Sequence, residues 1–501
     1  MTTAFVTRHA GTIDWAQSER LLPEGSVITA TFDAEDVQPG DLVIGTLPAH
    51  LAARICERGG RYQHLTLDLP ENLRGQDLTV AEMRACNARL EEFHIQRSTV
   101  RPGGSEQVVH IVLASGENLP NLIPALAPAF KAGQVIILAS KAMRANADKL
   151  RHGLHAAGLP ESDIRLRDDC PDHDLADIIT RAQHYAAGIA AEYPAGRLIL
   201  NLTGGNKLMT IGFLQAFRAC AEIIYCDTER SRIDYFHPIG RASEKLPVNL
   251  LGLAPYLAVQ GFKLRPASPD TGGITARQQL TQALVDGAPR MERLIGDLNK
   301  AAFFYREGRS ERARLDTPSH ANDRKLVDLM VDRGLLKGTG HHLAIVGDIA
   351  ASYLGGGWLE EWCWLIGKEL EQGEPGRRLH AKRWGINLQI DPWNQPDIPG
   401  RGQHPLNELD AVYVHRNRML LIECKSGVQI SERGESQDIL NKLETLGKHV
   451  AGRLDTKWLL TARRIDRNTQ ALQRAKEYGI HIVKPDDLAD LKSAILAWMT
   501  R

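Results

Sequence analysis

The sequence of 501 residues lacks several features that would place it in a familiar class of protein. Its seven cysteines form no C-x-x-C pair and no cysteine–histidine spacing typical of zinc sites. They are the small buried residues of a reducing compartment. The amino-terminal segment has no signal-peptide apolar core, and no apolar run approaches membrane-spanning length. We therefore expect a cytoplasmic protein with no membrane partner.

The chain also lacks an excess of charge of either sign. Its 61 Lys and Arg residues balance 61 Asp and Glu residues, so the formal net charge is zero. Without an overall basic field, contact with nucleic acid must depend on local patches. A hydrophobic content of 43% permits ordinary globular cores, and the length indicates two to four domains.

The patterning is of the α/β class and divides into four blocks. Residues 1–98 and 106–265 alternate short apolar strands with helices, which predicts two Rossmann-like domains with parallel sheets. The segment 96–107 has the composition of a linker. Residues 275–350 are mainly helical and end in a helix and two short strands, a winged-helix-like pattern. Residues 351–501 begin with a helix and form the fourth block.

The segment "ELDAVYVHRNRMLLIECKSG" places charged residues on two otherwise apolar strands. A hairpin turn at 416–417 would bring Asp410 opposite Glu423, and Lys425 would share their face. Two adjacent carboxylates repel unless a cation lies between them, and their oxygens suit Mg²⁺ or Mn²⁺. The Cys424 side chain would point to the other face, while its backbone carbonyl could still be a metal ligand.

The order Asp410, then Glu423-x-Lys425, resembles the PD-(D/E)xK nuclease superfamily. The resemblance implies a restriction-endonuclease-like α/β domain, catalysis by these three residues and a metal held by Asp410, Glu423 and the Cys424 carbonyl. The superfamily often adds an acidic residue on a preceding helix. The segment "GWLEEW" offers Glu360 or the residue after it, and we favour Glu360.

A later helix supplies Lys442 as a further polar candidate of this resemblance. The alternative explanation of the motif is a surface salt bridge between Glu423 and Lys425. The hairpin geometry, the apolar flanks and the upstream helix argue against it.

A second motif, "LTGGNK", lies between an apolar strand and an amphipathic helix. Glycines allow the backbone to approach a ligand closely, and the helix start together with Lys207 favours an anion. The motif is neither a Walker A loop nor G-x-G-x-x-G. A tight strand-to-helix connection would explain the glycines equally well.

Strand, "NLTGGNK" and helix resemble the CRISPR-associated Rossmann fold, or CARF, domain, and the first strand is followed by "ASGENLPNL". The resemblance implies a homodimeric sensor of cyclic oligoadenylate, either cyclic tetra-adenylate or cyclic hexa-adenylate. The implied ligand-binding residues are Ser115, Gly116, Asn118, Thr203, Gly204, Gly205, Asn206 and Lys207. Weaker candidates are Glu117, Asn121, Lys141 and Arg144.

The first block contains "MTTAFVTRHAGTIDWA", "DLVIGTLPAHLAA" and "YQHLTLDLP", which resemble a small CRISPR-associated family of implied ring nucleases. Thr7, Arg8 and His9 follow a strand, at the sheet edge where open α/β folds bind ligands. Arg8 could clamp a phosphate, and His9 could act as general acid or base. Thr46, with His50 one helical turn later, follows a second strand. Arg8 and His9 could instead serve the fold alone.

Together these resemblances imply a metal-dependent nuclease acting on DNA, RNA or both in type III CRISPR defence. Cyclic oligoadenylate would switch it on, and residues 1–98 would degrade this activator. A ligand-sensing winged-helix regulator without catalysis would leave the charged hairpin unexplained. A constitutive restriction or repair nuclease would leave "LTGGNK" and the first block unexplained.

Overall fold

The structure is a computed structural model. It describes residues 2–70, 73, 76–95, 107–265, 269–309, 311–338, 341–373, 378–393, 407–427, 433–452, 455–465 and 469–500. The linker predicted at 96–107 therefore lies almost entirely outside the described residues. The chain forms two compact units, residues 1–105 and 106–501, each of which is described by itself. Among the described residues, no helix is both long enough and apolar enough to cross a membrane.

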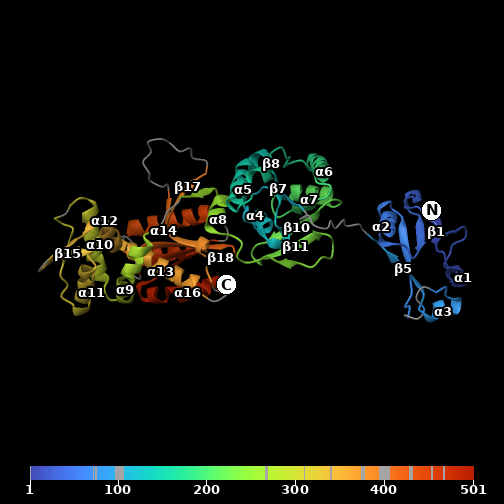
Figure 1. Cartoon of the computed structure of the whole chain (residues 1–501). Coiled ribbons are helices and arrows are strands. Elements are labelled where there is room, and N and C mark those ends of the chain that lie inside the picture. The colour runs from blue at the N-terminus through green and yellow to red at the C-terminus, as the bar shows by residue number, and fades with distance from the viewer. Residues whose placement is uncertain are drawn as a thin grey trace. The chain divides into compact units, whose positions relative to one another are not determined.

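The first unit is a five-stranded sheet of order β2-β1-β3-β4-β5 with helices beside it (Figure 1). The first four strands are parallel, whereas β5 is antiparallel to β4. The order reverses at β1, so the ends of β1 and β3 form a topological switch point. The elements are β1 (Thr3–Val6), α1 (Ala10–Ser18), β2 (Val27–Thr29), β3 (Leu42–Gly45), α2 (Ala49–Glu57), β4 (Arg61–Thr66), α3 (Val80–Ala85) and β5 (Arg89–Phe93).

The second unit begins with a seven-stranded sheet of order β12-β11-β10-β9-β6-β7-β8. Strands β6 to β10 are parallel, and β11 and β12 are antiparallel additions. The elements are β6 (Val108–Leu113), α4 (Leu119–Leu126), β7 (Gln134–Leu138), α5 (Arg144–Ala156), β8 (Ile164–Arg167), α6 (Leu175–Glu192), β9 (Arg197–Asn201), α7 (Lys207–Phe217), β10 (Glu222–Asp227), β11 (Arg232–His237), β12 (Glu244–Lys245) and α8 (Leu253–Gln260).

The mainly helical block follows, and it contains a small sheet of order β14-β16-β15 beside helix α11. This arrangement fits the predicted winged-helix-like pattern and adds a strand, β14, that the sequence did not predict. The elements are α9 (Thr271–Gly287), α10 (Glu292–Arg306), β14 (Arg314–Asp316), α11 (Ala321–Asp332), β15 (Leu336–Lys337), β16 (His342–Ile345) and α12 (Gly347–Ser352).

The last block is a six-stranded sheet of order β13-β17-β18-β19-β20-β21. Its first three pairings are antiparallel and its last two parallel. The elements are β13 (Phe262–Leu264), α13 (Trp358–Glu371), β17 (Trp384–Pro392), β18 (Asn407–His415), β19 (Arg418–Lys425), α14 (Arg433–Val450), β20 (Asp455–Thr461), α15 (Thr469–Glu477), β21 (Ile480–Val483) and α16 (Leu491–Thr500). Strand β13, expected in the second domain, is thus an edge strand of this six-stranded sheet.

Alternating side chains of β18 and β19 belong to two different cores. Tyr413 and Leu420 pack with α13, α16 and the helical block, whereas Val412 and Leu421 pack with α14 and with apolar residues of the preceding seven-stranded domain. Figure 1 shows α14 and α13 on opposite sides of these strands. Because successive side chains of a strand point to opposite faces, the hairpin that carries the charged residues packs against both neighbouring domains.

Candidate active site and ligand sites

The predicted hairpin of β18 and β19 is confirmed. His415 pairs with Arg418, and the register continues outward to Ala411 opposite Ile422. The two turn residues at 416–417 both have positive φ angles, 52° and 57°, as a two-residue type I′ turn requires. One position further outward are Asp410 and Glu423, whose charges interact in the structure, so the turn brings the two carboxylates close together.

Three charged side chains converge at this point of the sheet. Lys425 Nζ lies 2.7 Å from Glu423 Oε1 and 3.6 Å from Asp410 Oδ2. Asp410 Oδ2 also accepts a hydrogen bond of 2.7 Å from the backbone N–H of Cys424. Lys442, on α14, brings its Nζ to 3.7 Å from Glu423 Oε1. Glu423 is buried, so its charge depends on these cations.

The two adjacent glutamates of α13 have different surroundings. Glu361 is buried and forms a two-pronged ion pair with Arg277 of α9, at 2.5 Å. Glu360 lines the cavity that Lys425 also lines, and its charge interacts with Asp410. The structure therefore brings Glu360, the favoured candidate, to the charged hairpin and gives Glu361 a structural partner.

Burial and like charge perturb the acids of this site. Burial, together with the charge of Glu423, raises the pKa of Asp410 to about 6. Burial, with the charge of Asp410, raises the pKa of Glu360 to about 7. Burial alone would lower the pKa of Lys425, but the charges of Glu423 and Asp410 outweigh it and raise the pKa above its usual value. The carboxylates thus repel one another more than one lysine can offset.

The residues fit a divalent cation by their chemistry. Among the described residues, no three His, Cys, Asp or Glu side chains are already gathered as a metal cluster. Two carboxylates, a third acid nearby and a backbone carbonyl nevertheless form an all-oxygen set, which suits Mg²⁺ or Mn²⁺ with water ligands. The crowding that raises the pKa of Asp410 is what such an ion would relieve. The Cys424 side chain is buried in the opposite core, as predicted.

The sensor motif lies at the switch point of the seven-stranded sheet, between β6 and β9. A Cβ atom on Gly204 would lie 1.9 Å from the backbone oxygen of Leu113, so the loop after β9 reaches this close to β6 only with glycine there. Gly205 has a φ of +76° and Gly116 faces open space. Two loops thus meet at the sheet edge, where ligands bind open α/β folds.

Several predicted ligand residues hold these loops together. Asn118 donates to the backbone oxygen of Asn146, and the Thr203 hydroxyl bridges Asn201 and the N–H of Cys226. Asn206 caps α7 by accepting from the N–H of Met209. Their side chains are committed to the loops, so the ligand would meet mainly backbone there. Asn201 was missed by the sequence reasoning because it ends a buried strand.

Fewer polar side chains of these loops are exposed than are hydrogen-bonded within them. Lys207 is exposed at the start of α7, and its side chain has no hydrogen bond or ion pair in the part of the chain that the structure describes. The Ser115 hydroxyl donates to the backbone oxygen of Glu117. Arg144 forms ion pairs with Asp148 and Asp168, so its position is accounted for by contacts within the fold. Lys207 is therefore the cation best placed for an anionic ligand.

In the first unit, Thr7, Arg8, His9 and Thr46 all line one pocket of about 710 Å³ at the β1–β3 switch point. Arg8 is exposed and has no ion pair within the described ranges. His9 Nδ1 contacts the carboxylate of Asp77, a partner 68 residues away that the sequence reasoning missed. The pairing would fix the ring orientation of His9.

Two further polar residues of this unit, His64 and Thr46, form hydrogen bonds within the fold. His64 Nδ1 lies 2.7 Å from the Tyr62 hydroxyl, which in turn donates to the oxygen of Gly45. His64 is therefore a satisfied structural residue. The Thr46 hydroxyl reaches the backbone oxygen of Leu65 at 3.5 Å, which leaves it at the pocket wall.

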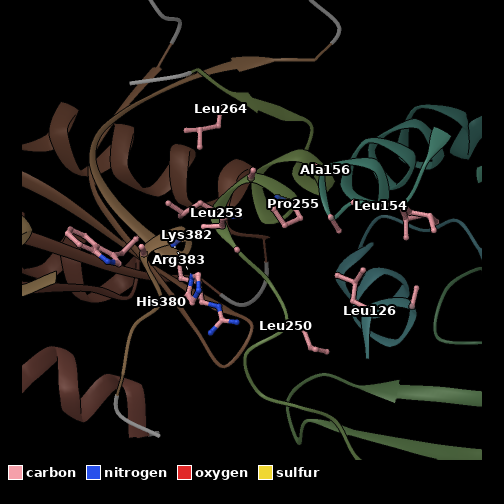
Figure 2. Close-up of a pocket in the computed structure, with 18 of the residues that line it drawn as sticks. Leu126, Leu154, Ala156, Leu250, Leu253, Pro255, Leu264, His380, Lys382 and Arg383 are labelled. Atoms are coloured by element: carbon pink, nitrogen blue, oxygen red, sulfur yellow. Dashed lines mark hydrogen bonds between the residues drawn. The ribbon is translucent and has the colours of Figure 1, made fainter. Parts of the chain in front are cut away.

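The sensor and the nuclease blocks also share a cavity of about 860 Å³ (Figure 2). One side carries Leu154 and Leu126 from the sensor helices, and the other carries His380 and Arg383 from the nuclease block. Beside it, the turn residue Asn417 accepts from the N–H groups of residues 250 and 251, at 3.1 and 3.3 Å. The segment at residues 250–251 is thus hydrogen-bonded to the turn of the charged hairpin.

Comparison with protein-family models gives three consecutive matches. Residues 4–96 match the CRISPR-associated protein family Cas_VVA1548, residues 109–250 match the Card1 CARF domain, and residues 348–501 match the Card1-like endonuclease domain. The chain therefore carries, in order, a region similar to a CRISPR-associated family, a region similar to a CARF domain and a region similar to an endonuclease domain. The sensor and nuclease regions are both similar to the Card1 type, which confirms the resemblance found in the motifs.

Two solved structures share the fold of most of this chain. One is protein VC1899 from Vibrio cholerae, with a TM-score of 0.65, 19% identity and coverage of 78% of this chain and 98% of that one. The other is Can2 from Sulfobacillus thermosulfidooxidans in complex with cyclic tetra-adenylate, with a TM-score of 0.60, 20% identity, and coverage of 79% and 98%. None of the curated proteins compared with the sequence matches it significantly.

Proposed function

We propose that the protein is a metal-dependent nuclease of type III CRISPR defence that cyclic oligoadenylate activates and that its first unit switches off. The observation that carries the proposal is the pairing of Asp410 and Glu423 beside Lys425, in a region similar to Card1-like endonucleases. The protein would act in the cytoplasm on DNA, RNA or both.

The nuclease residues divide the work by their positions. Asp410, Glu423 and the Cys424 carbonyl would hold Mg²⁺ or Mn²⁺, which when bound lowers the pKa of a water and neutralises phosphate charge. Lys425 lies close enough to both carboxylates to orient the attacking water and to stabilise charge on the scissile phosphate. Glu360 would complete the acidic wall of the site.

Regulation by a ring follows from the sensor region. A CARF-like fold, glycines at the switch point and an exposed Lys207 support binding of an anionic ring, and cyclic tetra-adenylate is the ligand bound to the structural relative Can2. Cyclic hexa-adenylate is the alternative activator. A homodimer would present two copies of the same loops to a symmetric ring. The hydrogen bonds between Asn417 and the connecting segment offer a path from this site to the catalytic hairpin.

The first unit would cleave the activator without a metal. A ribose 2′-OH can attack the adjacent phosphodiester, so the protein need only hold the geometry, clamp charge and transfer protons. Arg8 suits the clamp, and His9, oriented by Asp77, suits the proton transfer. Thr7 and Thr46 line the same pocket. The product would be linear oligoadenylate ending in a 2′,3′-cyclic phosphate.

One pair of assays tests both activities. With cyclic tetra-adenylate and Mn²⁺, the full chain should cut plasmid or single-stranded substrates, whereas Asp410→Asn or excess chelator should abolish cutting. In chelator, the same chain should still convert the ring to linear product, and Arg8→Ala/His9→Ala should not. Cutting by Asp410→Asn at the wild-type rate would refute the metal site, and a ring that survives incubation would refute the ring nuclease.

A further inference from the structure

Helix α10 supplies one wall of a cavity that borders the nuclease candidates. This cavity has a volume of about 1080 Å³, and Glu360, Cys424 and Lys425 line it. Most of the remaining lining comes from one face of α10, from residues 292 to 307. A helix from the small helical block thus borders the candidate active site.

The position of α10 relative to the hairpin is fixed by a buried contact. Asn299 Nδ2 donates to the backbone oxygen of Ser426 at 3.0 Å, and the Ser426 hydroxyl donates to Asn299 Oδ1 at 2.8 Å. Ser426 is buried and directly follows Lys425. A Cβ on Gly356, which has a φ of +131°, would lie 2.5 Å from the Ser426 hydroxyl, so the turn that leads into α13 also approaches this point closely. The wall is therefore held in register with the catalytic lysine.

The exposed side chains of this wall combine positive charge with an aromatic ring. Of the basic lining residues, Arg293 lies 4.0 Å from Asp297, and Arg463 lies 3.3 Å from Glu292. Lys300, by contrast, has no acidic partner among the ion pairs of the described residues.

Arg306 is the other lining cation without an acidic partner there, and its Nε contacts only the oxygen of Ala302, at 3.4 Å. Glu307 is the one further acid on this face. Between the two unpaired cations lies Phe303, which is 54% exposed and meets the ring of Phe304 edge to face at 5.7 Å.

We infer that this face of α10 binds the nucleic-acid strand that the nuclease cuts, with Phe303 stacking on an unpaired base and Lys300 and Arg306 contacting phosphates. Aromatic rings between basic residues are the usual platform for single-stranded nucleic acid. The inference rests on the proposed nuclease function and adds its substrate contacts.

The test measures binding of fluorescein-labelled single-stranded oligonucleotides, DNA and RNA, to full-length Asp410→Asn protein with cyclic tetra-adenylate and Mn²⁺. Adding Phe303→Ala or Phe303→Leu should weaken binding about 5- to 150-fold, the effect of losing one stacked base, whereas Phe303→Trp should preserve it. Lys300→Ala and Arg306→Ala should each reduce the salt dependence of log K by about 0.7. Ile349→Ala, an exposed apolar control at 63% exposure, should change nothing.

Two results would overturn the inference. One is unchanged binding by the Phe303→Ala variant. The other is that Phe303→Ala converts a dimer to a monomer in analytical ultracentrifugation, which would show that Phe303 joins two copies of the chain. Nucleic-acid cleavage by the wild-type chain shows whether only this inference fails or the proposed nuclease function fails as well. If the wild-type chain cuts and Phe303→Ala cuts equally well, only the α10 contact is wrong. If the wild-type chain with ring and metal cuts nothing, the nuclease proposal itself fails.

Discussion

The neighbouring glutamates of α13 allow chemistry and stability to be separated by two substitutions one residue apart. Glu361 is buried with Arg277 at 2.5 Å, and the guanidinium also lies 5.2 Å from the centre of the Tyr353 ring. Glu361→Ala would leave the Arg277 charge buried and unpaired, which costs about 3–5 kcal/mol. The melting temperature should then fall by roughly 6–20 °C. Chemistry should survive below that temperature, because the Glu361 side chain is committed to Arg277.

Glu360→Gln should have the opposite effect. The pKa of Glu360 lies near 7 instead of 4.5, so ionisation of this acid opposes folding by at most about 3 kcal/mol. Replacing it with neutral glutamine at pH 8, in chelator, should therefore keep or raise the melting temperature. Cleavage with Mn²⁺ should fall about 10- to 100-fold, as for other residues that support a metal site.

Differential scanning fluorimetry and an oligonucleotide cleavage assay on the same protein samples give both readouts. The reasoning fails if Glu360→Gln cuts at the wild-type rate. It also fails if Glu361→Ala retains its stability but loses activity, because the roles assigned to the two glutamates would then be exchanged.

Three further predictions concern the sensor and its link to the nuclease. Burial lowers the pKa of His110 from 6.5 to about 4. Below pH 6.5 the unfolded chain therefore binds a proton at this residue before the folded chain does, and the free energy of unfolding falls by up to about 3 kcal/mol as the pH drops towards 4. His110→Gln should flatten that pH dependence in thermal melts, and an unchanged slope would contradict the assignment. Gly204→Ala should weaken binding of cyclic tetra-adenylate at least tenfold in calorimetry, because its Cβ would push the loop from Leu113. Wild-type affinity of the Gly204→Ala variant for cyclic tetra-adenylate would refute the requirement for glycine beside Leu113. Asn417→Gly keeps the positive φ but loses the bonds to residues 250 and 251, so ring-dependent activation should fall while ring binding persists. Full activation would exclude this path.

The sequence predicts the charged hairpin of β18 and β19 well because its geometry is local. Once the turn at 416–417 is identified, counting outward gives the register that the structure shows as far as Ala411 with Ile422. One position further, it brings Asp410 near Glu423, and the period of two places Lys425 on the same face. The sequence offered both Glu360 and Glu361, but it could not show that Arg277, which pairs with Glu361 in the structure, lies 84 positions away.

The residues that the sequence could not supply act across long separations. Asp77 meets His9 over 68 positions, and Asn299 meets Ser426 over 127. Strand β13 has only three residues and no turn signature that assigns it to the nuclease sheet, and β5 gives no sign of its antiparallel pairing. In each case the partner is set by tertiary packing, which a local pattern does not encode.

The most direct test of ring-controlled cutting is the initial rate of cleavage of a fluorescent nucleic-acid substrate by the full chain, in Mn²⁺, as cyclic tetra-adenylate is titrated. The account predicts a low rate without the ring, a saturable rise of at least tenfold with it, and a half-activating concentration that Lys207→Ala increases. A rate that is the same with and without cyclic tetra-adenylate or cyclic hexa-adenylate would contradict it.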